Sequence, residues 1–100
     1  MTVAPRTAKR PRDQRAADTD DARAVPHRVI LYNDDVHPFD AVVRQVRKAT
    51  GRSTEEAFMI TLQAHEQGRA VCYAGSAEAC HRVADVLRKI ALQVEVNRAS

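Results

Sequence analysis

The residues best suited to chemistry lie in one short segment, Asn33, Asp34, Asp35 and His37, directly before Pro38. The amide oxygen and the two carboxylates are hydrogen-bond acceptors, and a neutral imidazole offers one more. An apolar run precedes the segment and a helix-like apolar pattern follows it, so these residues stand at a strand-to-helix junction. The pattern indicates a site that recognises a cation. An acidic turn that merely caps the next helix is the alternative interpretation.

Catalysis is a weaker interpretation of the chain. Cys80 and His81 are adjacent in a predicted helix, where neighbouring side chains diverge and cannot act as a nucleophile and its base. No Gly-rich phosphate-binding loop is present. Asp34, His37 and His65 permit a metal-dependent enzyme as a further hypothesis, but their spacing matches no metal motif. We therefore expect no enzyme, no metal and no cofactor.

Composition limits the class of protein and its partners. A chain of 100 residues allows one small domain, with a formal net charge of +3 and a basic excess concentrated in the first quarter. Two Tyr, two Phe and the lack of a contiguous basic helix argue against nucleic acid. Cys72 and Cys80 are expected to be buried, reduced thiols. No segment suits a membrane span or a signal peptide, so a cytoplasmic location is expected.

The first part of the chain differs from the rest. Residues 1–26 are expected to form a disordered extension, because Pro, Arg, Asp and Ala dominate and no periodic apolar residues could build a core. A folded core is expected over residues 27–97, followed by a short polar end at residues 98–100.

Three short segments have the composition of strands. Residues 28–32 are apolar on both faces, which favours a central strand, and residues 70–74 form a second strand. Residues 92–96 alternate between apolar and polar, as a half-buried strand does. With the helices between them, the order is β-α-α-β-α-β. This order predicts an α+β fold, a small three-stranded antiparallel sheet packed with three helices.

Capping signals mark the helices. Pro38 suits the first turn of one helix, with Asp35 or His37 near its cap, and Gly51 suits its end. Another helix begins after Ser76.

The helix predicted over residues 54–67 is the most distinctive. Ser53 and Glu56 form a capping box at its start. Its apolar residues are distributed around nearly the whole circumference of the helix, so we expect the helix to be buried on more than one side. Thr61 and His65 lie one turn apart on the same face.

A binding site follows if this helix packs beside the preceding one. Asn33 and Asp34 would then lie near His65, above an apolar space. That space would be lined by Phe39, Val42, Thr61 and Ala64. An acidic rim over an apolar pocket suits a primary ammonium attached to a bulky apolar side chain, because the ammonium has three donors to satisfy.

Four segments together resemble the ClpS family, the bacterial and plastid adaptors that hand proteins with destabilising N-terminal residues to the Clp protease. They are residues 29–35, 38–39, 64–70 and 76–78. The resemblance covers about residues 27–97. It implies a monomeric, non-catalytic adaptor that binds N-terminal Leu, Phe, Tyr or Trp and delivers the chain to a Clp unfoldase of the ClpA or ClpC type.

The resemblance also implies roles for individual residues. Asn33, Asp34 and His65 match the family residues that hold the substrate's α-amino group, and Asp35 and His37 belong to the loop that they shape. The side-chain pocket would be lined by Leu31, Phe39, Val42, Thr61, Ala64 and Leu92. Glu78 matches a surface that docks on the N-terminal domain of the unfoldase, and residues 1–26 match an extension that takes part in delivery.

The chain departs from the family at several of these positions. His37 stands where Thr is usual, Phe39 where many members have Met, Thr61 where a bulky apolar residue is usual and Ala64 where Val is frequent. The preferred N-terminal residue therefore stays open. The alternative from another class is a protein-interaction domain of similar topology that does not recognise N-terminal residues.

Overall fold

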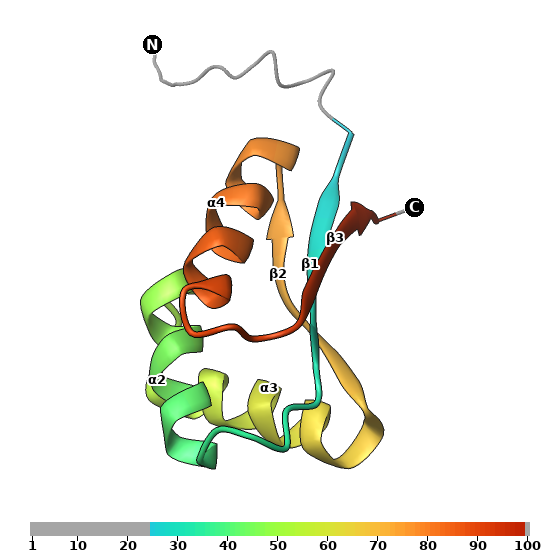
Figure 1. The fold of residues 1–100 in the computed structure, drawn as a ribbon. Helices are drawn as coiled ribbons and strands as arrows, with labels where there is room; N and C mark the ends of the chain where they lie inside the picture. The colour runs from blue at the N-terminus through green and yellow to red at the C-terminus, as the bar shows by residue number, and fades with distance from the viewer. Residues whose placement is uncertain (1–24, 100) are drawn as a thin grey trace, which may run out of the picture.

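The computed structural model describes residues 25–99, and its elements follow the predicted β-α-α-β-α-β order (Figure 1). The strands are β1 (His27–Tyr32), β2 (Arg69–Gly75) and β3 (Val94–Arg98). The helices are α2 (Phe39–Thr50), α3 (Thr54–Gln67) and α4 (Ala77–Arg88). The α+β class is therefore confirmed. All but the last two residues of the predicted extension, residues 1–26, lie outside the described residues.

The sheet is built around β1, as its two apolar faces predict. The strand order is β2-β1-β3, and both pairings are antiparallel. Val29 and Leu31 lie fully within the core, and Ile30 is also buried. An edge strand would leave part of this apolar surface in water, so the central position follows from burial.

Helix α4 lies along the sheet, while α2 and α3 lie toward the end at which β1 finishes (Figure 1). Leu87, Cys80 and Ala84 of α4 are fully buried in the same core cluster as the inward residues of β1. Cys72 of β2 is buried there as well, and both cysteines are free thiols, as expected. Burial raises the pKa of the Cys72 thiol to about 12, so it stays protonated and unreactive.

Helix α3 has the predicted bounds and the predicted capping box. Ser53 Oγ accepts from the Glu56 backbone N–H at 3.1 Å, and Glu56 Oε1 accepts from the Ser53 backbone N–H at 3.2 Å. The expectation that α3 is buried on more than one side is wrong. Only the small residues Ala57, Thr61 and Ala64 are buried, whereas Met59 is 59% exposed. The helix packs against neighbours along one face only, so its remaining apolar residues stay at the surface.

Helix α2 begins one residue later than its proline predicts. Pro38 is the N-cap residue, and its carbonyl accepts from the Ala41 backbone N–H at 3.0 Å. Neither Asp35 nor His37 caps the helix, because no side-chain cap bond is formed. At the other end Gly51 takes the left-handed conformation, with φ of 75°, as expected of a residue that ends a helix.

Strand β3 also begins later than predicted. Ala91 has a φ of 64°, and the Leu92 backbone N–H donates to the Leu87 carbonyl at 3.3 Å. These residues therefore belong to the turn that closes α4, and the strand pairing runs from Val94 to Arg98. Val94 and Val96 pack on the core, so the predicted alternation is confirmed.

No helix in the described part of the chain has the length and apolar character needed to cross a membrane.

Candidate functional site

The loop after β1 is held against the end of α3 by the backbone. The Asn33 N–H donates to the carbonyl of Gly68 at 2.9 Å. Gly68 closes α3 with a φ of 92°, a left-handed conformation that glycine adopts without the steric cost of a Cβ. This bond continues the pairing of β1 with β2, in which Tyr32 lies opposite Arg69. Together they place the acidic loop beside the end of α3.

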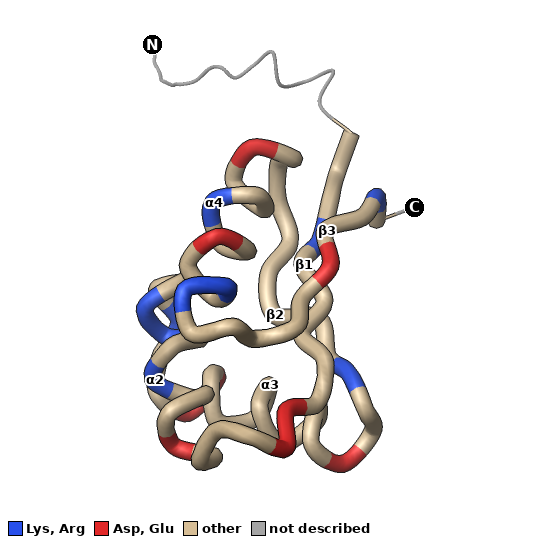
Figure 2. The backbone as a smooth tube through the Cα atoms, viewed as in Figure 1, with Lys and Arg blue, Asp and Glu red and all other residues tan. Residues whose placement is uncertain are grey.

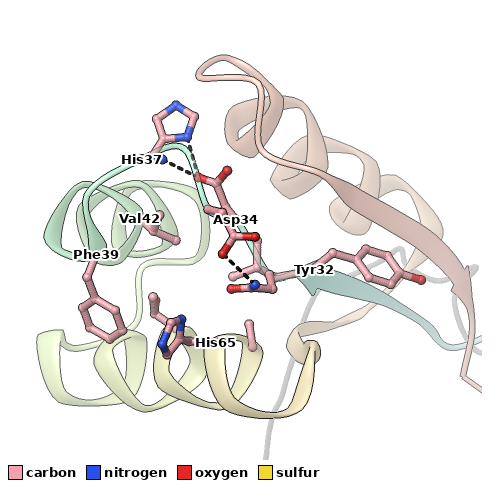
Figure 3. Close-up of a pocket in the computed structure, with 11 residues that line it drawn as sticks. Tyr32, Asp34, His37, Phe39, Val42 and His65 are labelled. Carbon is pink, nitrogen blue, oxygen red and sulfur yellow. Dashed lines mark hydrogen bonds and ion pairs between the residues drawn. The ribbon is translucent and has the colours of Figure 1, made fainter.

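Asp34 organises this loop. Its two carboxylate oxygens accept from the backbone N–H of Val36 at 3.2 Å and of His37 at 3.0 Å. The Nδ1 atom of His37 lies 2.5 Å from Asp34 Oδ2 (Figure 3). The loop is therefore shaped chiefly by Asp34 itself, which the sequence had assigned only to ligand binding.

Two opposing effects act on the pKa of the Asp34 carboxyl. Burial raises it, since a charged group loses hydration, while hydrogen bonds from the His37 ring and from the His37 and Val36 backbone lower it. The hydrogen bonds prevail and the net pKa lies below its ordinary value. Asp34 is thus a carboxylate at neutral pH, held in a fixed orientation.

Asn33 and Asp35 form a second polar pair on the same loop. Asn33 Nδ2 donates to Asp35 Oδ1 at 3.1 Å. Because its nitrogen is engaged, Asn33 presents its amide oxygen as an acceptor. The loop therefore offers acceptors from three consecutive residues.

A cavity of about 230 Å³ opens between this loop, α2 and α3. Its walls combine apolar side chains with the polar loop. The lining residues are Leu31, Tyr32, Asn33, Asp34, Asp35, His37, Phe39, Val42, Thr61, Ala64 and His65. The structure therefore brings together all of the predicted amine-binding and loop residues, and all but one of the predicted pocket residues.

One aromatic ring, that of Phe39, forms part of the cavity wall and packs against a second ring outside it. Phe39, at the start of α2, extends toward α3 (Figure 3). Its ring meets that of Phe58 edge-on, with centroids 5.2 Å apart and planes at 64°. This arrangement is a favourable one for aromatic pairs. His65 projects from α3 and also lines the cavity (Figure 3).

Leu92 is the predicted pocket residue that does not line the cavity. Only 3% of it is exposed, and it belongs to the core beneath the sheet and α4. The turn that follows α4 directs the Leu92 side chain into the core.

Tyr32 is the lining residue that the sequence did not identify as part of the site. Its side chain points away from His65 and Phe39 (Figure 3). Its hydroxyl donates to Glu95 Oε1 of β3 at 2.5 Å. Its position as the last residue of the strand, directly before Asn33, was the available signal.

Glu78 lies far from the cavity along the molecule. It belongs to the first turn of α4, which lies at the opposite end of the fold from the loop after β1 (Figure 1). Its side chain is exposed and forms a 3.5 Å ion pair with Arg82. Any role of Glu78 therefore concerns a surface separate from the cavity.

Charge is distributed unevenly around the site. None of the described residues that line the cavity is Lys or Arg. Figure 2 shows the acidic segment between β1 and α2, whereas basic residues gather on α2 and just after α4. Among residues 25–99, no group of three His, Cys, Asp or Glu side chains could hold a metal ion.

The fold and the cavity define a small α+β binding domain with an acidic rim over an apolar pocket. A family model described as ATP-dependent Clp protease adaptor protein ClpS matches residues 22–96. The chain therefore belongs to the ClpS family of Clp protease adaptors, a non-catalytic family.

Curated relatives agree with this assignment. The chain is 34% identical over 68 residues to the ClpS adapter of Aromatoleum aromaticum, a match that covers 65% of this chain and 67% of that protein. It is 32% identical over 69 residues to a ClpS adapter of Escherichia coli, which covers 69% of this chain and 65% of that one. The match to the Desulforapulum autotrophicum adapter is 39% over 46 residues and spans only 44% of its length.

A solved structure has the same fold. Agrobacterium tumefaciens ClpS2 bound to L-phenylalaninamide superimposes with a TM-score of 0.71 at 20% sequence identity. The match covers 76% of this chain and 99% of that one.

Proposed function

We propose that this protein is an adaptor that binds the free α-amino group and the bulky hydrophobic side chain of N-degron substrates and delivers them to a Clp AAA+ unfoldase. The observation that carries the proposal is one cavity that joins acceptors from Asn33, Asp34 and His65 to an apolar wall. An N-terminal residue is the part of a protein that combines an ammonium with a large side chain at one carbon atom. A capped or internal residue lacks the ammonium.

The energetics favour this ligand. A primary ammonium has three N–H donors, and each charge-assisted hydrogen bond contributes about 1.5–3 kcal/mol when water is excluded. Asp34 supplies the charge, Asn33 an amide oxygen, and neutral His65 a nitrogen lone pair. Burial of a large aliphatic or aromatic side chain against Leu31, Val42 and neighbouring residues adds roughly 1.5–3 kcal/mol.

The relative with a bound ligand supports the same chemistry. The ligand of the Agrobacterium protein, L-phenylalaninamide, combines a free α-amino group with an aromatic side chain. We accordingly propose N-terminal Leu, Phe, Tyr and Trp as the substrate class. A cavity of about 230 Å³ gives room for such side chains.

Delivery requires a second contact, which we place on the surface at the start of α4. Glu78 there would dock on the N-terminal domain of a ClpA- or ClpC-type unfoldase, leaving the cavity free for substrate. Residues 1–26 would act as the extension used in delivery, and the adaptor would work as a monomer in the cytoplasm.

The test is a binding panel with peptides that differ only in the first residue. Each peptide with Leu, Phe, Tyr or Trp first is measured with a free and with an acetylated N-terminus, and a peptide with Asp first is the control. We expect binding only by the free, hydrophobic N-termini. Equal affinity for the free and acetylated forms would refute the proposal, because acetylation removes the ammonium and leaves the side chain intact.

A further inference from the structure

We propose that His37 acts through Asp34 as a positioning residue of the ammonium site: its neutral imidazole holds the carboxylate in place, and its protonation weakens ligand binding. The inference rests on the proposed function. It adds a positioning role for His37 and a dependence of ligand binding on the protonation of its ring. His37 lines the cavity, but its role is exerted on Asp34 rather than on the ligand.

The contact between the two side chains is close and partly shielded. His37 Nδ1 and Asp34 Oδ2 are 2.5 Å apart, and the side chains are 25% and 14% exposed. The same carboxylate oxygen also accepts from the His37 backbone N–H at 3.0 Å. His37 thus contacts the Asp34 carboxylate through both its backbone N–H and its ring, so the carboxylate has little freedom to rotate.

The orientation of the ring decides what a proton would do. Nδ1 is directed at Asp34, whereas the other ring nitrogen points away from the carboxylate (Figure 3). In the neutral ring the Nδ1–H donates to Asp34, and Nε2 carries a lone pair. A proton added at Nε2 therefore leaves the Nδ1 contact intact and places a full positive charge beside Asp34.

That charge competes with the ligand. The carboxylate attracts an ammonium because its own charge is unopposed, and an imidazolium at hydrogen-bond distance neutralises it. A carboxylate already paired with a cation gains less from a second cation. Binding should therefore weaken while the loop keeps its shape, which separates this effect from unfolding of the loop.

Other ionisable groups face the same space and must be separated from His37. They are Asp35 on the loop, Tyr32 at the end of β1 and His65 on α3. The Tyr32 hydroxyl is bonded to Glu95 outside the cavity, and the ordinary pKa of an Asp lies below the range in which imidazoles titrate. His65 is a second imidazole at the cavity, and a proton on it would remove the lone pair that accepts from the ammonium.

Two substitutions of His37 separate positioning from titration. His37→Asn places an amide N–H where Nδ1–H stands and does not titrate, whereas His37→Ala removes the donor. Affinity for one free-N-terminus peptide with Phe first is measured from pH 5.5 to 8 for wild type and both variants, with melting temperatures as the control for folding. The acetylated peptide is measured alongside.

At pH 8 we expect His37→Ala to weaken binding about fivefold to tenfold, and His37→Asn to restore most of that loss, because one charge-assisted bond spans this range. On lowering the pH to 5.5, wild type should lose about tenfold more affinity than His37→Asn. The other ionisable groups, which include His65 and the peptide's own α-amino group, are common to both proteins and cancel in this comparison.

Equal affinity of His37→Ala and wild type at pH 8, or the same pH profile for His37→Asn and wild type, would overturn the inference while leaving the proposed function intact. Failure of wild type to distinguish free from acetylated peptide would instead overturn the proposed function, and this inference with it.

Discussion

Asp34 combines two tasks that proteins more often divide between residues. Its carboxylate accepts from two backbone N–H groups and from the His37 ring, and it also lines the cavity. These donors fix the direction of the carboxylate and lower its pKa, so the acceptor is charged and oriented before a ligand arrives. Pre-organisation of this kind reduces the cost of ordering the site on binding.

Removal of the charge at Asp34 should weaken peptide binding about tenfold or more, because one charge-assisted hydrogen bond contributes in that range. We expect this for Asp34→Ala and Asp34→Asn with a free-N-terminus peptide, measured by calorimetry. Asp40→Ala is the matched control, since Asp40 is an exposed carboxylate on α2 outside the cavity. A similar loss in the control would show that net charge, rather than the site, governs binding.

Replacement of His65 by Ala should weaken binding to a similar degree, about tenfold or more, because the ammonium loses an acceptor. His81→Ala on α4 is the control, an exposed histidine that does not line the cavity. The melting temperature should change little in both. A large drop for His65→Ala alone would indicate a structural role in place of ligand binding.

The lowered pKa of Asp34 also makes a prediction about stability. A carboxyl group whose pKa is lower in the folded state contributes stability at pH values above its unfolded pKa, here an ordinary value of 3.8. That contribution is lost as the pH falls through the lower, folded value. The difference in unfolding free energy between wild type and Asp34→Asn should therefore be constant near neutral pH and shrink as the pH falls below the ordinary value of 3.8. A difference independent of pH would contradict it.

Helix α3 contributes to the cavity through the face that has its smallest side chains. Ala57, Thr61 and Ala64 are its buried residues, and the last two line the cavity. Small side chains at these positions leave the space that a larger residue would fill. The Thr61 hydroxyl donates to the Ala57 carbonyl at 2.8 Å, which satisfies its hydrogen within the helix.

The capping box of α3 can be tested apart from the site. Ser53→Ala removes the acceptor for the Glu56 N–H and should lower the unfolding free energy by about 0.5–2 kcal/mol. Urea unfolding measures this loss. Peptide affinity should be unchanged, because Ser53 lies at the start of α3 and His65 near its end. A loss of affinity without a loss of stability would be inconsistent with a capping role.

The whole molecule depends on one core shared by the sheet and the three described helices. Leu87 is fully buried among residues of the sheet and of α2. Leu87→Ala should cost about 2–5 kcal/mol, a large part of the ~5–15 kcal/mol typical of a domain. Met59→Ala, at an exposed position on α3, should cost far less. Thermal unfolding of both variants checks this, and equal effects would contradict the assignment of the core.

Local patterns accounted for most of the fold. The two-sided apolar run of β1 predicted its central place, and the Ser53–Glu56 pair predicted the start of α3, because both signals depend on near neighbours in the chain. The errors came where distant contacts decide. Met59 stays exposed because none of the helices and strands within residues 25–99 covers that side of α3. Leu92 enters the core because the chain turns at Ala91.

Residue types and spacing along the chain were enough to identify the acceptors, the helix that carries His65 and the resemblance to the family. The separate roles of these residues follow from contacts between distant segments. Tertiary contacts place the loop against Gly68, pack Phe39 of the cavity wall against Phe58, and set the His37 ring on Asp34. Residue types and their periodicity can be identified from the chain alone. Which side chain contacts which acceptor depends on how separate segments pack in three dimensions.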